Sequence, residues 1–189
     1  MRRLFAVLLA ASLTTACVAP VLIVGGAALG AAWVGSDPRA PEVVKADFDL
    51  RRRLDQQIVD TFKSRAHVNV NVFNGHILLT GEVPDAAARA QLEQMAGSYD
   101  PARLLNEVVI GATSSLADRA NDGQLAARVR ARILADSPNT AATHVLVVAE
   151  RRVVYLMGIT SPQVATTVAK SASLVPGVSQ VVKLLEVGS

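Results

Sequence analysis

The chain contains a single cysteine, Cys17, and a thiol is a side chain with ready covalent chemistry. A lone cysteine cannot form an intramolecular disulfide, and a catalytic thiol needs a base that a folded scaffold holds beside it. Cys17 instead closes a leader, in which Arg2 and Arg3 precede an apolar run from Leu4 to Leu13 and three small residues. This order is typical of a secretory signal, and it predicts a modified rather than a catalytic cysteine.

The residues before Cys17 resemble a bacterial lipobox, in which the cysteine is acylated and the chain is cut just before it. Thr15 and Ala16 fit this pattern, whereas Thr14 stands where leucine is usual and Leu13 lies one place early. The resemblance implies lipid attachment at Cys17. Two or more acyl chains hold a protein stably on a membrane, whereas one chain does not.

An apolar stretch rich in Gly and Ala follows the cysteine over residues 18–34. Its 17 residues are slightly short for a membrane-spanning helix. Joined to the leader it would be long enough, so an uncleaved signal anchor is the alternative to a lipidated tether. Residues 36–41 contain two prolines and end any helix there. Val18, rather than aspartate, follows the cysteine; by the sorting rule of bacterial lipoproteins this implies the outer membrane.

Composition and charge exclude several classes of function. Without the leader the chain carries 17 basic and 16 acidic residues, a net charge of +1, which is too small an excess for a general nucleic-acid binder. We find no Cys/His cluster with zinc spacing, no obvious pair of carboxylates for acid–base catalysis and no phosphate-binding loop. The sequence therefore predicts neither an enzyme nor a protein that holds a metal or cofactor, and it indicates no small-molecule substrate.

The rest of the chain reads as two copies of one unit. In the first copy, apolar residues spaced by four predict a helix, alternating valines predict a strand, and Asn74 followed by Gly75 predicts a tight hairpin turn. The expected order is helix, strand, strand, helix, strand, at 48–64, 68–72, 76–81, 84–97 and 104–110.

The second copy repeats this order with a shift of 77 residues in its strands. Gly81 corresponds to Gly158, and His67 corresponds to His144. Ser161 is a suitable N-cap for the second helix because proline follows it. The expected α+β unit is a three-stranded sheet with two helices over one face. The elements of the second copy are expected at 118–134, 145–149, 154–158, 161–174 and 178–187.

This unit resembles the BON domain, the bacterial OsmY and nodulation module. The resemblance rests on residues 68–75 and 77–81, on their counterparts 145–158, and on Gly177, Val178 and Val181, which match the family's G-V-x-x-V ending. Together with the leader, the two copies resemble the dual-BON outer-membrane lipoproteins. The boundaries implied are a signal peptide at 1–16, a lipidated tether at 17–41, and BON domains at 42–113 and 114–189.

The resemblance also implies a function without catalysis. Such a protein would face the periplasm, bind anionic phospholipid and support the integrity of the envelope. A lipid-tethered adaptor that docks on outer-membrane assembly proteins is the alternative. Liposome binding distinguishes the two, because the first function requires it and the second does not.

The second copy is the better candidate for contact with an anionic membrane. Residues 42–111 carry a net charge of −2, and residues 117–189 carry +3. An apolar stripe edged by arginines can insert among lipid headgroups, although the same stripe can equally pack on its own sheet. The candidate phospholipid-binding residues are Leu125, Arg128, Val129, Arg130, Arg132 and Ile133.

The outward faces of the two sheets differ in polarity. Asn69 and Asn71 of the first copy become Leu146 and Val148 in the second. Tyr155 and Met157 add to the same face of the second sheet. An apolar outer face marks a contact surface. We predict that the two copies pack against each other through it; a partner protein or a lipid tail is the other interpretation.

Overall fold

The computed structural model describes residues 37–137 and 140–187. Cys17, the signal peptide and most of the tether lie outside the described residues, so the expectations for them stay predictions. The described elements are α1 (Pro41–Phe62), a 3-10 turn (Lys63–Arg65), β1 (His67–Phe73), β2 (His76–Val83), α2 (Ala86–Gly97), β3 (Arg103–Asn106), β4 (Val109–Ile110), α3 (Leu116–Asp136), α4 (Thr140–Thr143), β5 (Leu146–Glu150), β6 (Val153–Thr160), α5 (Pro162–Ser173) and β7 (Gln180–Val187).

Each copy forms its own mixed sheet around a central strand. In the first, β2 pairs antiparallel with β1 and parallel with β3 and β4. In the second, β6 pairs antiparallel with β5 and parallel with β7. The parallel pairings require crossovers, and α2 and α5 supply them. The predicted α+β fold of two repeated units is confirmed.

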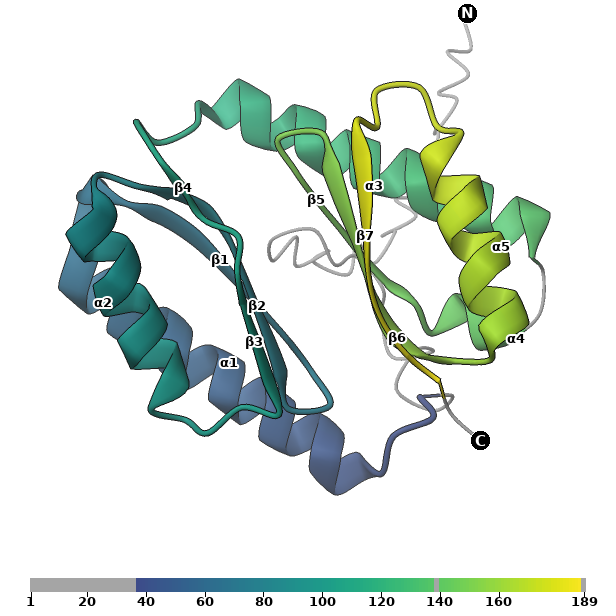
Figure 1. The fold of residues 1–189 in the computed structure, drawn as a ribbon, viewed down its shortest axis with the longest axis horizontal. Helices are drawn as coiled ribbons and strands as arrows, with labels where there is room; N and C mark the ends of the chain where they lie inside the picture. Colours follow the sequence, from purple (N-terminus) through teal and green to yellow (C-terminus); the bar gives the residue numbers. More distant parts are fainter. Residues whose placement is uncertain (1–36, 138–139, 188–189) are drawn as a thin grey trace, which may run out of the picture.

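The helices cover one face of each sheet because their apolar stripes need burial. Leu54, Ile58 and Phe62 of α1 pack with β1, β2 and α2 in the first core. The corresponding stripe of α3 packs in the second core with β5, β6 and α5. Figure 1 shows α1 and α2 on one outer side of the molecule and α3 and α5 on the other.

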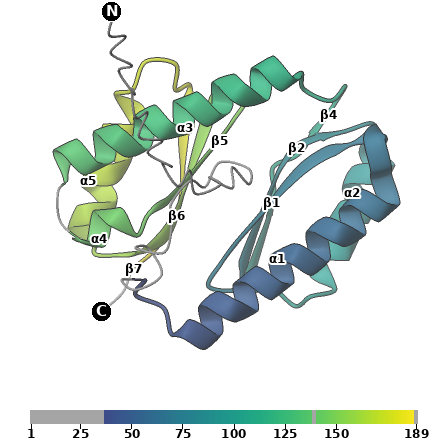
Figure 2. The same cartoon turned by 180° about the vertical axis from the view of Figure 1, so that it is seen from behind.

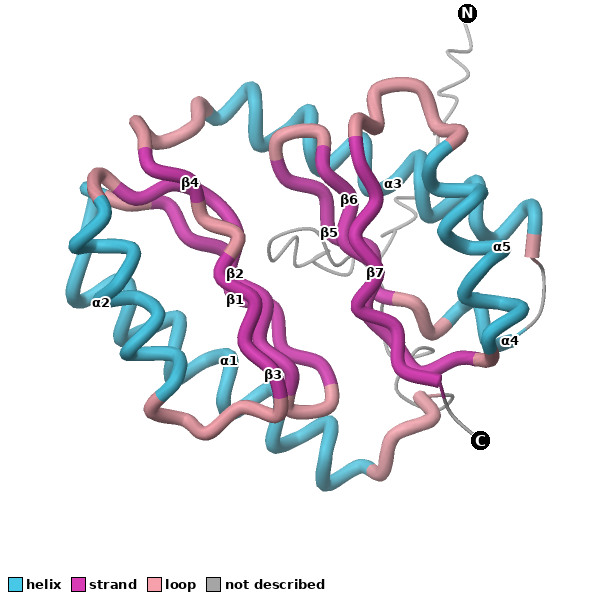
Figure 3. The backbone as a smooth tube through the Cα atoms, in the orientation of Figure 1, coloured by secondary structure: helices cyan, strands magenta, loops and turns pink. Residues whose placement is uncertain are grey.

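The other faces of the two sheets pack against each other, so the order of layers is helices, sheet, sheet, helices (Figures 1 and 3). Phe73 and Leu78 of the first sheet form a buried cluster with side chains of the second. Tyr155 and Met157, predicted to mark a contact surface, are 4% and 1% exposed. Packing between the copies is therefore confirmed.

Several element boundaries shift by one to three residues from the sequence predictions, and three differences are larger. α1 begins at Pro41 rather than at residue 48, because proline is tolerated in the first turn of a helix. The closing strand of the first copy is split into β3 and β4, and Val108 turns into the core between them. The short helix α4 was not expected from the sequence. None of the described helices is long and apolar enough to cross a bilayer.

Candidate functional site

The apolar stripe of α3 lies inside the second copy. Leu125, Val129 and Ile133 are at most 4% exposed and belong to its core. They are not available for insertion among lipid headgroups, so this part of the candidate site is corrected. The alternative, packing on its own sheet, is what the structure shows. A stripe that covers a sheet and a stripe that enters a membrane have the same helical spacing, which is why the sequence left both open.

The three candidate arginines of α3 have different surroundings. Arg130 is half-buried and donates to the carbonyl oxygen of Thr143 at 3.2 Å, and burial lowers the pKa of its guanidinium. Arg132 pairs with Asp136 at 2.7 Å. Arg128 is exposed and makes no ion pair within the described part of the chain. Arg128 is therefore the candidate most available to an external anion.

Arg128 reaches the turn that joins α5 to β7. Its Nη2 atom lies 3.8 Å from the position that a Cβ of Gly177 would take. Arg152 donates from Nε to the carbonyl oxygen of Gly177 at 3.1 Å. The guanidinium groups of Arg128, in α3, and Arg152, in the turn between β5 and β6, thus lie beside the same turn. Leu174, at the start of this turn, is 56% exposed, so the edge combines two cations with an apolar side chain.

The hairpin turn that presents Arg152 has an unusual backbone. Arg151 and Arg152 have φ values of 50° and 68°, and the corresponding Asn74 and Gly75 have 51° and 74°. A turn with two positive φ values favours Asn-Gly, and each non-glycine residue in this region is strained. Asp122 of α3 stabilises the strained turn by accepting from the backbone N–H of Arg151 at 2.9 Å. Arginine thus occupies both positions of the turn despite a conformational cost.

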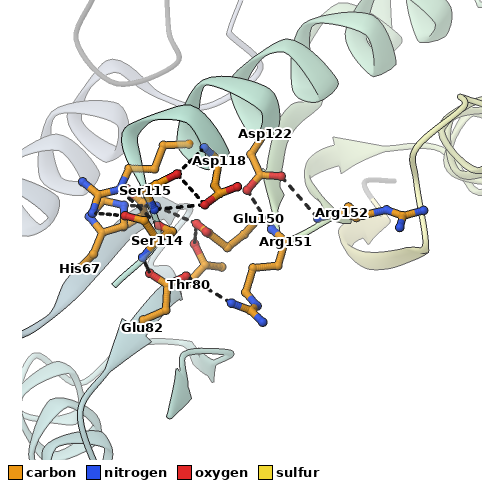
Figure 4. Close-up of polar contacts among 12 residues, drawn as sticks. His67, Thr80, Glu82, Ser114, Ser115, Asp118, Asp122, Glu150, Arg151 and Arg152 are labelled. Atoms are coloured by element: carbon orange, nitrogen blue, oxygen red, sulfur yellow. Dashed lines mark hydrogen bonds and ion pairs between the residues drawn. The ribbon is translucent and has the colours of Figure 1, made fainter. Parts of the chain in front are cut away.

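A second polar cluster joins the two copies (Figure 4). Glu82 of β2 is fully buried, and Arg151 lies 3.6 Å from its Oε1 atom. Its other oxygen accepts from the backbone N–H of Ser114 in the connection to α3 at 3.0 Å. Glu150 of β5 accepts from Asn69 in the first copy at 2.8 Å. Glu82 and Glu150 therefore fix the connection and the second hairpin to the first sheet.

A groove of about 380 Å³ lies beside this cluster, between β1 and β5. These are the edge strands of the two sheets, and Figure 2 shows them at corresponding edges, with α1 and α3 outside them. Sequence reasoning missed the groove. The sequence feature that could have indicated it is the replacement of Asn69 and Asn71 in the first copy by Leu146 and Val148 in the second. This difference gives the groove one polar and one apolar wall.

The histidines do not form a metal site in the described ranges, 37–137 and 140–187. Those residues contain no group of three or more His, Cys, Asp or Glu side chains that could hold a metal ion. His67 lines the groove, and its burial and the nearby Arg119 lower the pKa of its imidazole. His76 lies 3.7 Å from Glu186 across the two copies.

Comparison with protein families decides the identity of the repeat. The model of the BON domain matches residues 46–110 and again residues 121–189. The chain belongs to the BON domain family. Both matches begin inside the first helix of a copy and include all of its strands, so the repeated α-β-β-α-β unit is one BON domain.

Two curated relatives resemble almost the whole chain. The chain is 29% identical over 173 residues to the outer membrane lipoprotein DolP of Haemophilus influenzae, a match that covers 90% of this chain and 88% of the relative. It is 29% identical over 152 residues to a 21 kDa hemolysin of Actinobacillus pleuropneumoniae, covering 79% and 78%. The solved structure of CdsD from Chlamydia trachomatis has 12% identity over 74% of this chain and 92% of its own, with a TM-score of 0.31.

Proposed function

We propose that this dual-BON protein is a lipid-anchored outer-membrane protein that faces the periplasm and binds anionic phospholipid without catalysing a reaction. The similarity to the outer membrane lipoprotein DolP supports the location, and the leader that ends at Cys17 supports the anchor. The anchor keeps the BON domains near a bilayer. Weak contacts with headgroups then suffice, because tethering raises the effective concentration of the lipid.

The observation that carries the proposal is the meeting of Arg128 and Arg152 at the turn of Gly177. Guanidinium groups bind phosphate through two parallel hydrogen bonds. The exposed Leu174 beside them provides a short apolar contact. This edge replaces the buried stripe of α3 as the contact surface. Of the candidate residues expected from the sequence, Arg128 belongs to this edge, whereas Arg132 forms an ion pair with Asp136.

Liposome co-sedimentation of a chain that starts at Ser36 tests this proposal, because that chain keeps every described contact but lacks the lipid. We expect Arg128→Gln with Arg152→Gln to lower binding to phosphatidylglycerol vesicles at least fivefold, with little binding to phosphatidylcholine by either protein. Arg52→Gln is the matched control, since Arg52 is an exposed arginine of α1 in the first copy. Equal binding by all three proteins would refute the proposed edge.

A second candidate function rests on α1. Phe48 is 61% exposed and Val59 is 54% exposed, and a spacing of eleven residues places them on the same side of the helix. An aromatic and an aliphatic side chain exposed on one side of a helix, about three turns apart, suit a protein partner, such as a component of the outer-membrane assembly machinery. Loss of a co-purified envelope protein in Phe48→Ala, with liposome binding unchanged, would favour this adaptor function.

A further inference from the structure

The groove between β1 and β5 has unpaired backbone along both sides. Within the described residues, β1 pairs only with β2, and β5 pairs only with β6. Half of the backbone N–H and C=O groups of an edge strand point away from its neighbour and can pair with another chain. An extended peptide that adds to such an edge gains main-chain hydrogen bonds.

The side chains of the groove suit an uncharged peptide. Asn69 is engaged with Glu150, but the side-chain amide of Asn71 makes no hydrogen bond with any described residue. Leu146 and Val148 line the opposite wall. A free amide lies across from apolar side chains here, so an occupant needs polar backbone groups and uncharged, mainly apolar side chains. An extended apolar segment in which Ala, Gly and Val predominate has both.

The charges at the rim favour no charged occupant. Arg51 and Asp55 of α1 line one side of the groove, and Arg119 and Asp122 of α3 line the other. Each helix thus contributes one charge of each sign, and the carboxylate of Glu150, which also lines the groove, is engaged by Asn69 and Thr80. A strongly acidic or basic peptide would meet repulsion as well as attraction along this groove, whereas an uncharged segment meets neither.

The chain enters the described structure at one end of this groove. The guanidinium carbon of Arg39 lies 3.9 Å from the ring centroid of Phe73, and Phe73 directly follows Val72, which lines the groove. Arg39 is fixed there by ion pairs with Asp37 and Asp47. The segment before Asp37 therefore starts beside the groove, and residues 18–36 contain no charged side chain.

We propose that residues 29–35 of this same chain occupy the groove as an added strand. The groove follows β1 from His67 to Val72, about 20 Å at 3.3 Å per residue, which is the reach of six or seven extended residues. A segment that ends near Phe73 runs parallel to β1. It runs antiparallel to β5, because Glu150 at the end of β5 contacts Asn69 near the start of β1.

Disulfide scanning of the full-length, membrane-held protein tests the proposal. Each of residues 29–35 is changed to cysteine in a chain that also carries Asn71→Cys, and the products are oxidised and resolved by size. We expect strong intramolecular cross-linking at alternate positions, independent of protein concentration, since side chains of a strand alternate between two sides. Asn71→Cys alone gives the background that arises from the natural Cys17.

Matched variants keep the test decisive. Val59→Cys on the exposed side of α1 replaces Asn71→Cys as a control and should cross-link at least tenfold less. Ala126→Trp narrows the groove from α3 and should lower cross-linking at least fivefold, whereas Ala90→Trp on the exposed side of α2 should not. A flat pattern equal to that of the Val59→Cys control would overturn the proposal. Covalent dimers in place of intramolecular products would also overturn it and identify a second copy as the occupant.

Discussion

Asn69 of the first BON domain donates from its side-chain amide to Glu150 of the second at 2.8 Å, 81 residues later in the chain. Thr80, directly opposite Asn69 in the first sheet, also lies within hydrogen-bond distance of Glu150, at 3.4 Å. One buried carboxylate thus accepts from two strands of the other domain.

The dependence of stability on pH should reveal the protonation of the Glu150 carboxyl. Burial raises the pKa of its carboxyl, and the neighbouring Glu82 and Asp122 add to the rise. A carboxyl with a raised folded-state pKa binds a proton more readily in the folded protein than in the unfolded chain. Protonation of Glu150 therefore increases the free energy of unfolding as the pH falls through the raised pKa toward the ordinary pKa of 4.5.

Urea denaturation at several pH values between 4.5 and 7 checks this sign. We expect Glu150→Gln to flatten the dependence in that window, because the amide does not titrate. Asp118→Asn should leave the dependence on pH in that window unchanged. Hydrogen bonds from Ser115 lower the pKa of Asp118, so the stability that this carboxylate contributes is lost only below about pH 3.8. An unchanged slope in Glu150→Gln would contradict the buried pairing.

The apolar contact between the sheets should contribute strongly to stability. Met157 is 1% exposed in the cluster shared by both domains, and truncation of a buried methionine costs about 2–5 kcal/mol. Met157→Ala should therefore destabilise the whole chain in thermal and urea unfolding. Leu174→Ala, at a side chain 56% exposed, should change the free energy of unfolding by less than about 0.5 kcal/mol. Equal effects would mean that the sheets do not stay packed in solution.

Asp47 should be far more important than its neighbour Asp49. Asp47 pairs with Arg39 at 2.5 Å and accepts from the backbone N–H groups of Asn74 and Gly75. Asp47→Ala leaves the guanidinium with one fewer partner in a buried site, at a cost of about 3–5 kcal/mol. Asp49→Ala breaks only an exposed pair with Lys45, and such pairs contribute little to stability. Chemical denaturation of both variants measures the difference, and similar losses would contradict the assigned role of Asp47.

Corresponding glycines of the two domains should tolerate alanine differently. Gly81 has φ = 113°, and a Cβ there would lie 2.1 Å from the carbonyl oxygen of His67. A Cβ on Gly158 would lie 3.1 Å from the carbonyl oxygen of His144. Gly81→Ala should therefore unfold the first domain or cost more than about 3 kcal/mol, and Gly158→Ala should cost clearly less. Melting temperatures of the two variants give the order, and a reversed order would refute the packing at Gly81.

The sequence predicted the repeated unit well because its signals are local. Alternating valines around Asn74–Gly75 predicted the first hairpin, and the N-cap role expected of Ser161 is confirmed by its hydrogen bond with the backbone N–H of Val164. The exchange of two asparagines for Leu146 and Val148 also predicted the contact between sheets. Each of these depends on residues close in sequence or on a direct comparison of the two copies.

The contacts that the sequence did not predict join residues far apart in the chain. Asp47 binds a turn 27 residues later, and Glu82 meets Arg151, 69 positions further on. Nothing in the spacing of these carboxylates distinguishes them from solvated charges on a surface. The helical stripe of α3 was ambiguous for another reason, since an amphipathic pattern does not say which apolar surface the helix meets.

The ion pairs of Arg39 also determine how the molecule would respond to force. Asp37, Arg39 and Asp47 fasten the first described residues to α1 and to the hairpin at Asn74, beside the ring of Phe73. A pull on the preceding chain would load these bonds before it could unwind the first turn of α1. With the chain anchored as proposed, tension from a moving membrane would reach the hairpin at Asn74 and the ring of Phe73 through these ion pairs.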